Sequence, residues 1–342
     1  MFAWNRRGLM GLVLGVTALA AVQGIEEVSA QTAITVAVPN PSAITWTPLW
    51  VAIGEGYFAD AGLDITVEAV DGSSQVLQAM AAGQAQIGAP GPGPVLAARA
   101  RDVDVVFLYN LYPKSVFGLM VKDEASYQSP ADLKGQVIGV GTADGAEVAF
   151  AQAILNDLGL SEGSDYEFLP VGDGGTAAVA FMGEEVEAYA AAVSDAAILA
   201  SRGLQLREIT PEQYLAFFGN GFAALQGTID QSPEIIDGFG KALVRGMNFA
   251  IDPANQDTVL AHCAAGNPQE GEDKDFAASL LAAVLERMTP TDAVSDQGFG
   301  YQPPEHWALW HQSAIDSGTL SEPLADLQAA YSNDYIEGWN AD

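Results

Sequence analysis

Residues 71–83 read DGSSQVLQAMAAG, and residues 173–183 read DGGTAAVAFMG. Each stretch follows a strand-like run and passes, through a small hydroxyl residue, into a helix-like run that contains Met and ends in Gly. A strand, a helix and a further strand form the βαβ unit of a mainly parallel sheet. The repetition predicts an α/β protein of two similarly built lobes, although two unrelated βαβ units could resemble each other by chance.

The segments around these stretches continue the alternation of strands and helices. Strands are expected at 33–38, 64–70, 85–89, 136–140, 165–171 and 185–193, and the helix that starts near residue 47 is expected to run to residue 62. The last third predicts helices at 233–251, 274–288, 303–318 and 322–339 that pack back on the first lobe. We therefore expect residues 31–113 with 222–342 to form one lobe and residues 114–221 to form the other.

The composition limits the classes of partner. The chain has 342 residues, 49% of them hydrophobic, which is ample for a buried core. Its 44 acidic residues against 13 Lys and Arg give a net charge of −31. Nucleic-acid binding requires clustered basic side chains, which are absent from the sequence, so nucleic acid is not an expected partner. The acidity is typical of a well-solvated surface.

Residues 1–30 are predicted to be a secretory signal peptide. Arg6 and Arg7 precede an uncharged apolar run over 8–22, and a small-residue cleavage site follows at 28–30. The run is shorter than the roughly twenty residues of a membrane span, so no stable membrane insertion is expected. We expect a mature monomer in the periplasm that begins at Gln31 and, with Cys263 as its single cysteine, contains no internal disulfide.

Candidate ligand-binding residues lie in loops that follow the expected strands. In two α/β lobes these loops face one another, and most lead into helix starts whose unpaired N–H groups can bind the oxygens of a small polar solute. Ser73 or Ser74 could also cap its own helix. The candidates are Asn40, Ser42, Trp46, Ser73, Ser74, Gln75, Gly91, Gly93, Thr142, Asp144, Glu147, Thr176 and Asp195.

Residues 88–94 read GAPGPGP, a stiff corner with few side chains. One interpretation is the floor of a cleft, in which Gly91 and Gly93 keep their amides uncovered. The other is a tight turn from strand to helix without a ligand. Trp46 has two interpretations as well, a flat wall of the pocket or a core residue.

The segment PLWVAIGEGYFADAGLDITVE (48–68), followed by AAGQAQIGA (81–89), resembles the solute-binding proteins of ABC importers that serve alkanesulfonates, taurine, nitrate and thiamine-precursor pyrimidines, the SsuA/THI5-like and NMT1-like group. The resemblance covers the mature chain, although Gln86 stands where the family commonly has Asp. It implies a two-lobed, hinged periplasmic-binding-protein fold and an ABC importer permease as partner. It also implies that the ligand contacts the loop after the first strand, the helix start at Ser73 and the corner at Gly91, with Tyr109 and Asn110 near the crossing between lobes.

Catalysis, a metal site and a cofactor are not expected. His306 and His311 lie five residues apart, which suits a zinc pair poorly, and Cys263 lacks a base within reach because its neighbour His262 diverges from it on a helix. A pyrimidine-synthesising enzyme shares the fold implied by the resemblance. That enzyme has a cysteine-rich motif, which a chain with a single Cys cannot have. A ligand-sensing subunit remains a further alternative.

The loops contain carboxylates but no Lys or Arg, and the aromatic residues Trp46, Tyr109 and Tyr112 supply flat faces. This combination favours an aminopyrimidine-like or amine-bearing solute. Helix starts alone can bind a sulfonate, so a sulfonate, taurine or nitrate binder remains the alternative.

Overall fold

The computed structural model describes residues 31–143, 145–172, 174–211, 213–214, 217–290 and 294–341. The predicted signal peptide and the candidate Asp144 lie outside the described residues. Residues from Gln31 onward form one compact unit. No helix among the described residues is long and apolar enough to cross a membrane.

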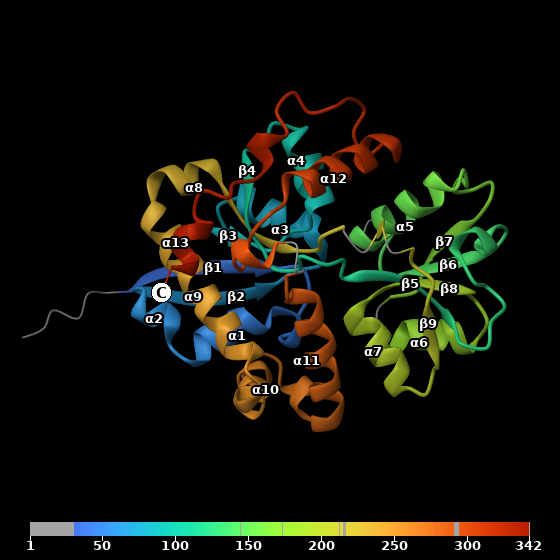
Figure 1. Cartoon of the computed structure of the whole chain (residues 1–342), viewed down its shortest axis with the longest axis horizontal. Coiled ribbons are helices and arrows are strands. Elements are labelled where there is room, and N and C mark those ends of the chain that lie inside the picture. The colour runs from blue at the N-terminus through green and yellow to red at the C-terminus, as the bar shows by residue number, and fades with distance from the viewer. Residues whose placement is uncertain are drawn as a thin grey trace, which may run out of the picture. The chain divides into compact units, whose positions relative to one another are not determined.

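The fold contains two mixed five-stranded sheets (Figure 1). The first sheet has the order β2-β1-β3-β10-β4 and consists of β1 (Thr32–Val38), β2 (Leu63–Ala69), β3 (Ile87–Gly88), β4 (Val105–Asn110) and β10 (Gly221–Leu225). The second has the order β7-β6-β8-β5-β9 and consists of β5 (Phe117–Lys122), β6 (Val137–Val140), β7 (Glu167–Pro170), β8 (Ala188–Ala192) and β9 (Leu206–Glu208).

The two sheets have equivalent topologies. In each, the second strand of the order pairs in parallel with two neighbours, β1 with β2 and β3, and β6 with β7 and β8. The fourth strand in each order, β10 or β5, is antiparallel to both of its neighbours. β5 is the first strand after the chain leaves β4, and β10 is the first after it leaves β9, so each antiparallel strand follows a crossing between sheets. The predicted repeat of βαβ units is therefore present in the fold.

Helices connect and flank the sheets. The chain forms α1 (Thr47–Gly54), α2 (Tyr57–Asp60), α3 (Gly72–Ala81), α4 (Pro92–Arg99), α5 (Ala146–Asp157), α6 (Gly175–Met182), α7 (Val193–Ser201), α8 (Gln226–Gln231), α9 (Pro233–Ile251), α10 (Gln256–Gly266), α11 (Lys274–Met288), α12 (Pro304–Asp316) and α13 (Ile336–Asn340). Figure 1 shows α5, α6 and α7 beside the second sheet. The predicted lobe boundaries at 113/114 and 221/222 remain a proposal.

Two helix predictions are wrong. The helix expected to reach residue 62 ends at Gly54, because Gly56 adopts a left-handed φ of 77° before α2 begins. The helix expected over 322–339 is replaced by an irregular segment with a 3₁₀ turn and the short α13. There Tyr331 forms a bridge with Phe107 and Ser332 N donates to Phe107 O at 3.0 Å, so the sheet edge determines the backbone of this segment.

The C-terminal helices pack on elements of the first sheet's half, as α11 does on the loop after β1 and α12 does on α4, and two of them also contact the second half. α9 and α10 contact α1, as expected, and an added Cβ at Gly246 of α9 would lie 2.3 Å from Pro48 O, which shows how closely α9 approaches α1. In addition, α11 contacts α7, which follows the second sheet's β8, and α12 contacts both α4 and α5. Helices from the end of the chain therefore connect the two halves.

The two crossing segments are hydrogen bonded to each other. Gly219 N donates to Tyr112 O at 2.8 Å, and Tyr112 N donates to Asn220 O at 3.3 Å. A Cβ added at Gly219 would lie 2.8 Å from Val116 Cγ1 and 3.0 Å from Tyr112 Cβ, closer than side-chain atoms normally approach. Gly219 is therefore the residue that allows the crossings to lie side by side.

Candidate functional site

A cavity of about 410 Å³ is lined by residues from both sheets' loops, the crossing segments and α11. Such a volume is in the range of small-molecule sites. The loop after β1 contributes Asn40, Ser42 and Trp46, and the start of α3 contributes Asp71 and Ser73. Thr142 and Glu147 near the start of α5, and Ser194 and Asp195 in the first turn of α7, form the opposite side.

The loop after β1 is held in shape by Asn40. Its Oδ1 accepts hydrogen bonds from Ser42 N at 3.0 Å and from Trp46 Nε1 at 3.3 Å. Trp46 is only 2% exposed and its ring meets Phe222 edge to face at 6.2 Å between centroids. Trp46 therefore lines the cavity and is also packed in the core, so the structure combines its two interpretations and its contact with a solute stays a prediction.

Carboxylates in the cavity wall accept hydrogen bonds from backbone amides. Glu147 Oε1 accepts from Thr142 N at 3.0 Å, and Asp195 Oδ1 accepts from Gly174 N at 3.1 Å. Glu270 Oε2 accepts from Ile44 N at 2.9 Å. Among the described residues that line the cavity, none is Lys, Arg or His. The wall therefore offers negative and neutral groups to a solute.

Sequence reasoning named Tyr112 as a flat face for the ligand but missed Asn220 and α11 as parts of the wall. Tyr112 donates from its hydroxyl to Thr45 O at 2.6 Å, and Asn220 Nδ2 donates to Ala89 O at 3.1 Å, so both connect the crossing to loops of the first sheet. Phe276, Leu280 and Val284 line the cavity from α11 at intervals of four residues. This interval was visible in the sequence, but it is equally typical of a helix packed on a core.

The Gly/Pro corner is a turn beside the crossing, and none of its residues lines this cavity. Gly91 N donates to Ser73 Oγ at 3.0 Å, and Gly221 N donates to Pro90 O at 3.3 Å. Gly91 therefore does not keep its amide uncovered, and Ser73 binds the corner while α3 has no side-chain cap. Gly93 lies in the first turn of α4 and, with Ser74, lines a second cavity of about 740 Å³.

Four other candidates lie away from the first cavity. Tyr109 is 2% exposed and packs against Phe222 and Trp339, and burial raises the pKa of its hydroxyl. Asn110 is also buried, and its Nδ2 donates to Tyr301 O at 3.4 Å. Gln75 and Thr176 are exposed and do not line the cavity. Gln86, the departure from the family pattern, accepts from Thr35 N at 2.9 Å and so binds the backbone of β1 just before β3 begins.

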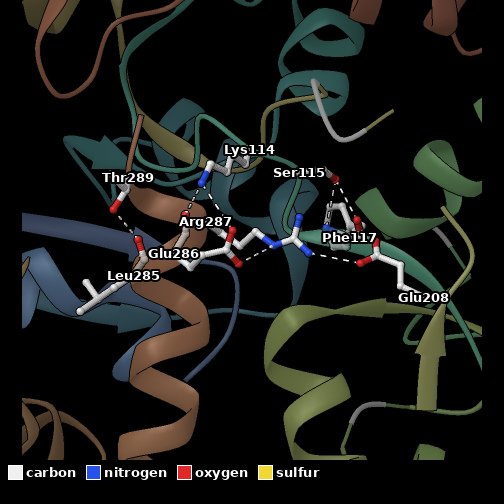
Figure 2. A network of polar contacts seen from close by, with 8 residues as sticks. All are labelled: Lys114, Ser115, Phe117, Glu208, Leu285, Glu286, Arg287 and Thr289. Atoms are coloured by element: carbon white, nitrogen blue, oxygen red, sulfur yellow. Dashed lines mark hydrogen bonds and ion pairs between the residues drawn. The ribbon is translucent and has the colours of Figure 1, made fainter. Parts of the chain in front are cut away.

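Ion pairs lie at the end of α11, between the cavity wall and β9. Figure 2 shows Arg287 extending to Glu208, with 3.4 Å between Arg287 Nη2 and Glu208 Oε2. Lys114, in the first crossing, donates to Glu286 O at 2.9 Å. α11 is thus connected to the crossing and to the second sheet as well as to the cavity. No group of three metal-ligating side chains occurs within the described ranges.

The protein has two sheets of equivalent topology, each flanked by helices, and a cavity of small-molecule size is lined by their loops. This is the architecture of a periplasmic binding protein. The fold matches the periplasmic aliphatic sulphonate binding protein SsuA from Escherichia coli with a TM-score of 0.67, at 16% identity over 87% of this chain and 91% of that one. The chain belongs to the NMT1/THI5 like family of solute-binding proteins, whose family model matches residues 43–256.

Two curated relatives are named as binding proteins. The riboflavin-binding protein RibY of Chloroflexus aurantiacus is 28% identical over 309 residues, which cover 88% of this chain and 84% of the relative. The formylaminopyrimidine-binding protein of Halalkalibacterium halodurans is 25% identical over 285 residues, covering 78% of this chain and 79% of the relative.

Proposed function

We propose that this protein captures an uncharged or amine-bearing nitrogen heterocycle in the cavity between its sheets and delivers it to the permease of an ABC importer. The observation that carries the proposal is the chemistry of the cavity wall. Aromatic side chains such as Phe117, Tyr189 and Phe276 line it together with carboxylates, and its described lining includes no cation. Such a wall can contact a flat ring and accept hydrogen bonds from ring or amino N–H groups.

The relatives support this solute class. Both are named for nitrogen heterocycles, a flavin in one case and an aminopyrimidine in the other. The sulphonate-binding protein shares the fold at low identity and so supports the architecture without specifying the solute. We further propose that the protein acts in the periplasm after residues 1–30 are removed, which amino-terminal sequencing of the exported protein would test by finding Gln31 first.

Retention of a solute from a defined mixture tests the proposal. The protein is incubated with riboflavin, formylaminopyrimidine, taurine and nitrate, separated from free solute, and analysed by mass spectrometry. A heterocycle should be retained, and Phe276→Ala, which removes a ring from the wall, should retain less. Leu309→Ala is the matched control, because Leu309 is 43% exposed on α12 and is not part of the wall. Retention of taurine or nitrate alone would contradict the proposal.

A further inference from the structure

Two carboxylates in the first turns of helices α5 and α7 line the cavity, and each accepts a hydrogen bond from a backbone amide outside its own helix. Helix starts present N–H groups and a partial positive charge, which normally favour a bound anion. Near the start of α5, Glu147 accepts from Thr142 N, and Asp195 in the first turn of α7 accepts from Gly174 N. Both side chains line the cavity, and Asp195 is only 8% exposed.

Gly145 allows the Glu147 carboxylate to fold back over its loop. A Cβ added at Gly145 would lie 2.1 Å from Glu147 Oε2 and 2.2 Å from Oε1, so a larger residue would displace the carboxylate. Gly145 itself lines the cavity. The Glu147 carboxylate is therefore located over the loop at the start of α5, where the cavity would otherwise favour an oxyanion.

We propose that Glu147 and Asp195 are specificity-determining residues that exclude oxyanions from the cavity. This inference rests on the proposed function, since it concerns the same site. A sulfonate, nitrate or phosphate ester would meet two carboxylates at the helix starts that line the cavity, and like charges repel. The same two carboxylates do not repel an uncharged solute, and they attract an amine-bearing one. The site should therefore accept a heterocyclic solute and reject its phosphorylated form.

The test replaces each carboxylate by its amide. Glu147→Gln, Asp195→Asn and the double variant keep an oxygen that can accept from Thr142 N or Gly174 N, and they remove the negative charge. Binding of ethanesulfonate and of nitrate is measured by calorimetry on the full mature protein. We expect the double variant to bind ethanesulfonate at least about tenfold more tightly than the wild type, which corresponds to about 1.4 kcal/mol. Each single variant should show part of the gain.

Asp132→Asn is the matched control. Asp132 also accepts backbone hydrogen bonds near a helix start, from Gln128 N at 2.8 Å and Ser129 N at 2.9 Å, but it is not part of the cavity wall. This variant should leave anion binding unchanged, which separates a local effect from the loss of one unit of overall charge. Circular dichroism and melting temperature establish that each variant is folded, and the single variants serve if the double variant is not.

Equal anion affinity in the wild type and the folded variants, including no detectable binding by any of them, would overturn the inference. So would an equal gain in Asp132→Asn. The proposed function fails by a different result, the absence of any retained heterocycle in the wild type. The two failures are therefore distinguishable.

Discussion

Trp46 lies at the boundary between the core and the cavity, and its burial determines what its removal should do. With 2% of its surface exposed, Trp46→Ala should lower the free energy of unfolding by about 3 to 5 kcal/mol, as large core aromatics do. Urea denaturation measures this loss. Trp46→Phe is the control, because it keeps a ring against Phe222 and loses only the 3.3 Å contact of Nε1 with Asn40. Unchanged stability of the Ala variant would show that Trp46 is a cavity wall and no core residue.

Cys263 should be chemically inert in the folded protein. Burial raises the pKa of its thiol to about 12, partly offset by a contact with the Thr47 hydroxyl at 3.7 Å. Because the thiolate is the reactive form, Ellman's reagent should label the native protein at pH 8 far more slowly than the protein in urea. Rapid labelling under native conditions would mean that Cys263 is accessible. The thiol resists ionisation when folded, so its contribution to stability is complete below pH 9 and declines as the pH rises above that value.

The sequence could predict those cavity residues that lie in loops at the carboxyl ends of parallel strands, because such loops meet at one edge of a sheet. Asn40, Ser42, Thr142, Glu147 and Asp195 follow this rule and line the cavity. Tyr109 and Asn110 were inferred from the family resemblance, and they lie instead in a core whose side chains come from distant parts of the chain. Gly91 is turned away from the cavity by its bond to Ser73, which the local sequence does not reveal.

At the scale of elements, the crossing is where a small change should matter most. Gly219→Ala would bring a Cβ within 2.8 Å of Val116 and 3.0 Å of Tyr112, so we expect a loss of about 1 to 3 kcal/mol in the free energy of unfolding. Gly338→Ala is the matched control, because a Cβ there meets no atom within 4 Å and α13 should tolerate it. Comparing the two variants by thermal unfolding tests the close approach. Equal stabilities would mean that the crossings are not tightly packed.

Helices with a strong apolar periodicity and clear ends were predictable, whereas elements fixed by distant contacts were not. The predictions at 233–251 and 274–288 coincide with α9 and α11. The segment around Tyr331 has helix-like periodicity, but the pairing with Phe107 prevents a continuous helix. The position of α11 against α7 could not be predicted either, because periodicity identifies an apolar face without identifying its partner.

At the scale of the whole molecule, a two-lobed binding protein should close on its solute. The crossings and α11 connect the halves, and a solute that contacts both sides of the cavity should favour a more compact form. Small-angle scattering of the mature protein should therefore give a smaller radius of gyration with saturating solute than without it. An unchanged radius at saturation would indicate a rigid molecule or a site on one side only.

The central claim is that a cavity lined by aromatic residues and carboxylates selects a nitrogen heterocycle. Calorimetry of the wild-type protein tests this claim most directly. Riboflavin and formylaminopyrimidine are titrated separately, beside nitrate and ethanesulfonate under the same conditions. We predict micromolar or tighter binding of at least one heterocycle and no measurable binding of either anion. Tight binding of nitrate or ethanesulfonate, with no binding of either heterocycle, would contradict the account.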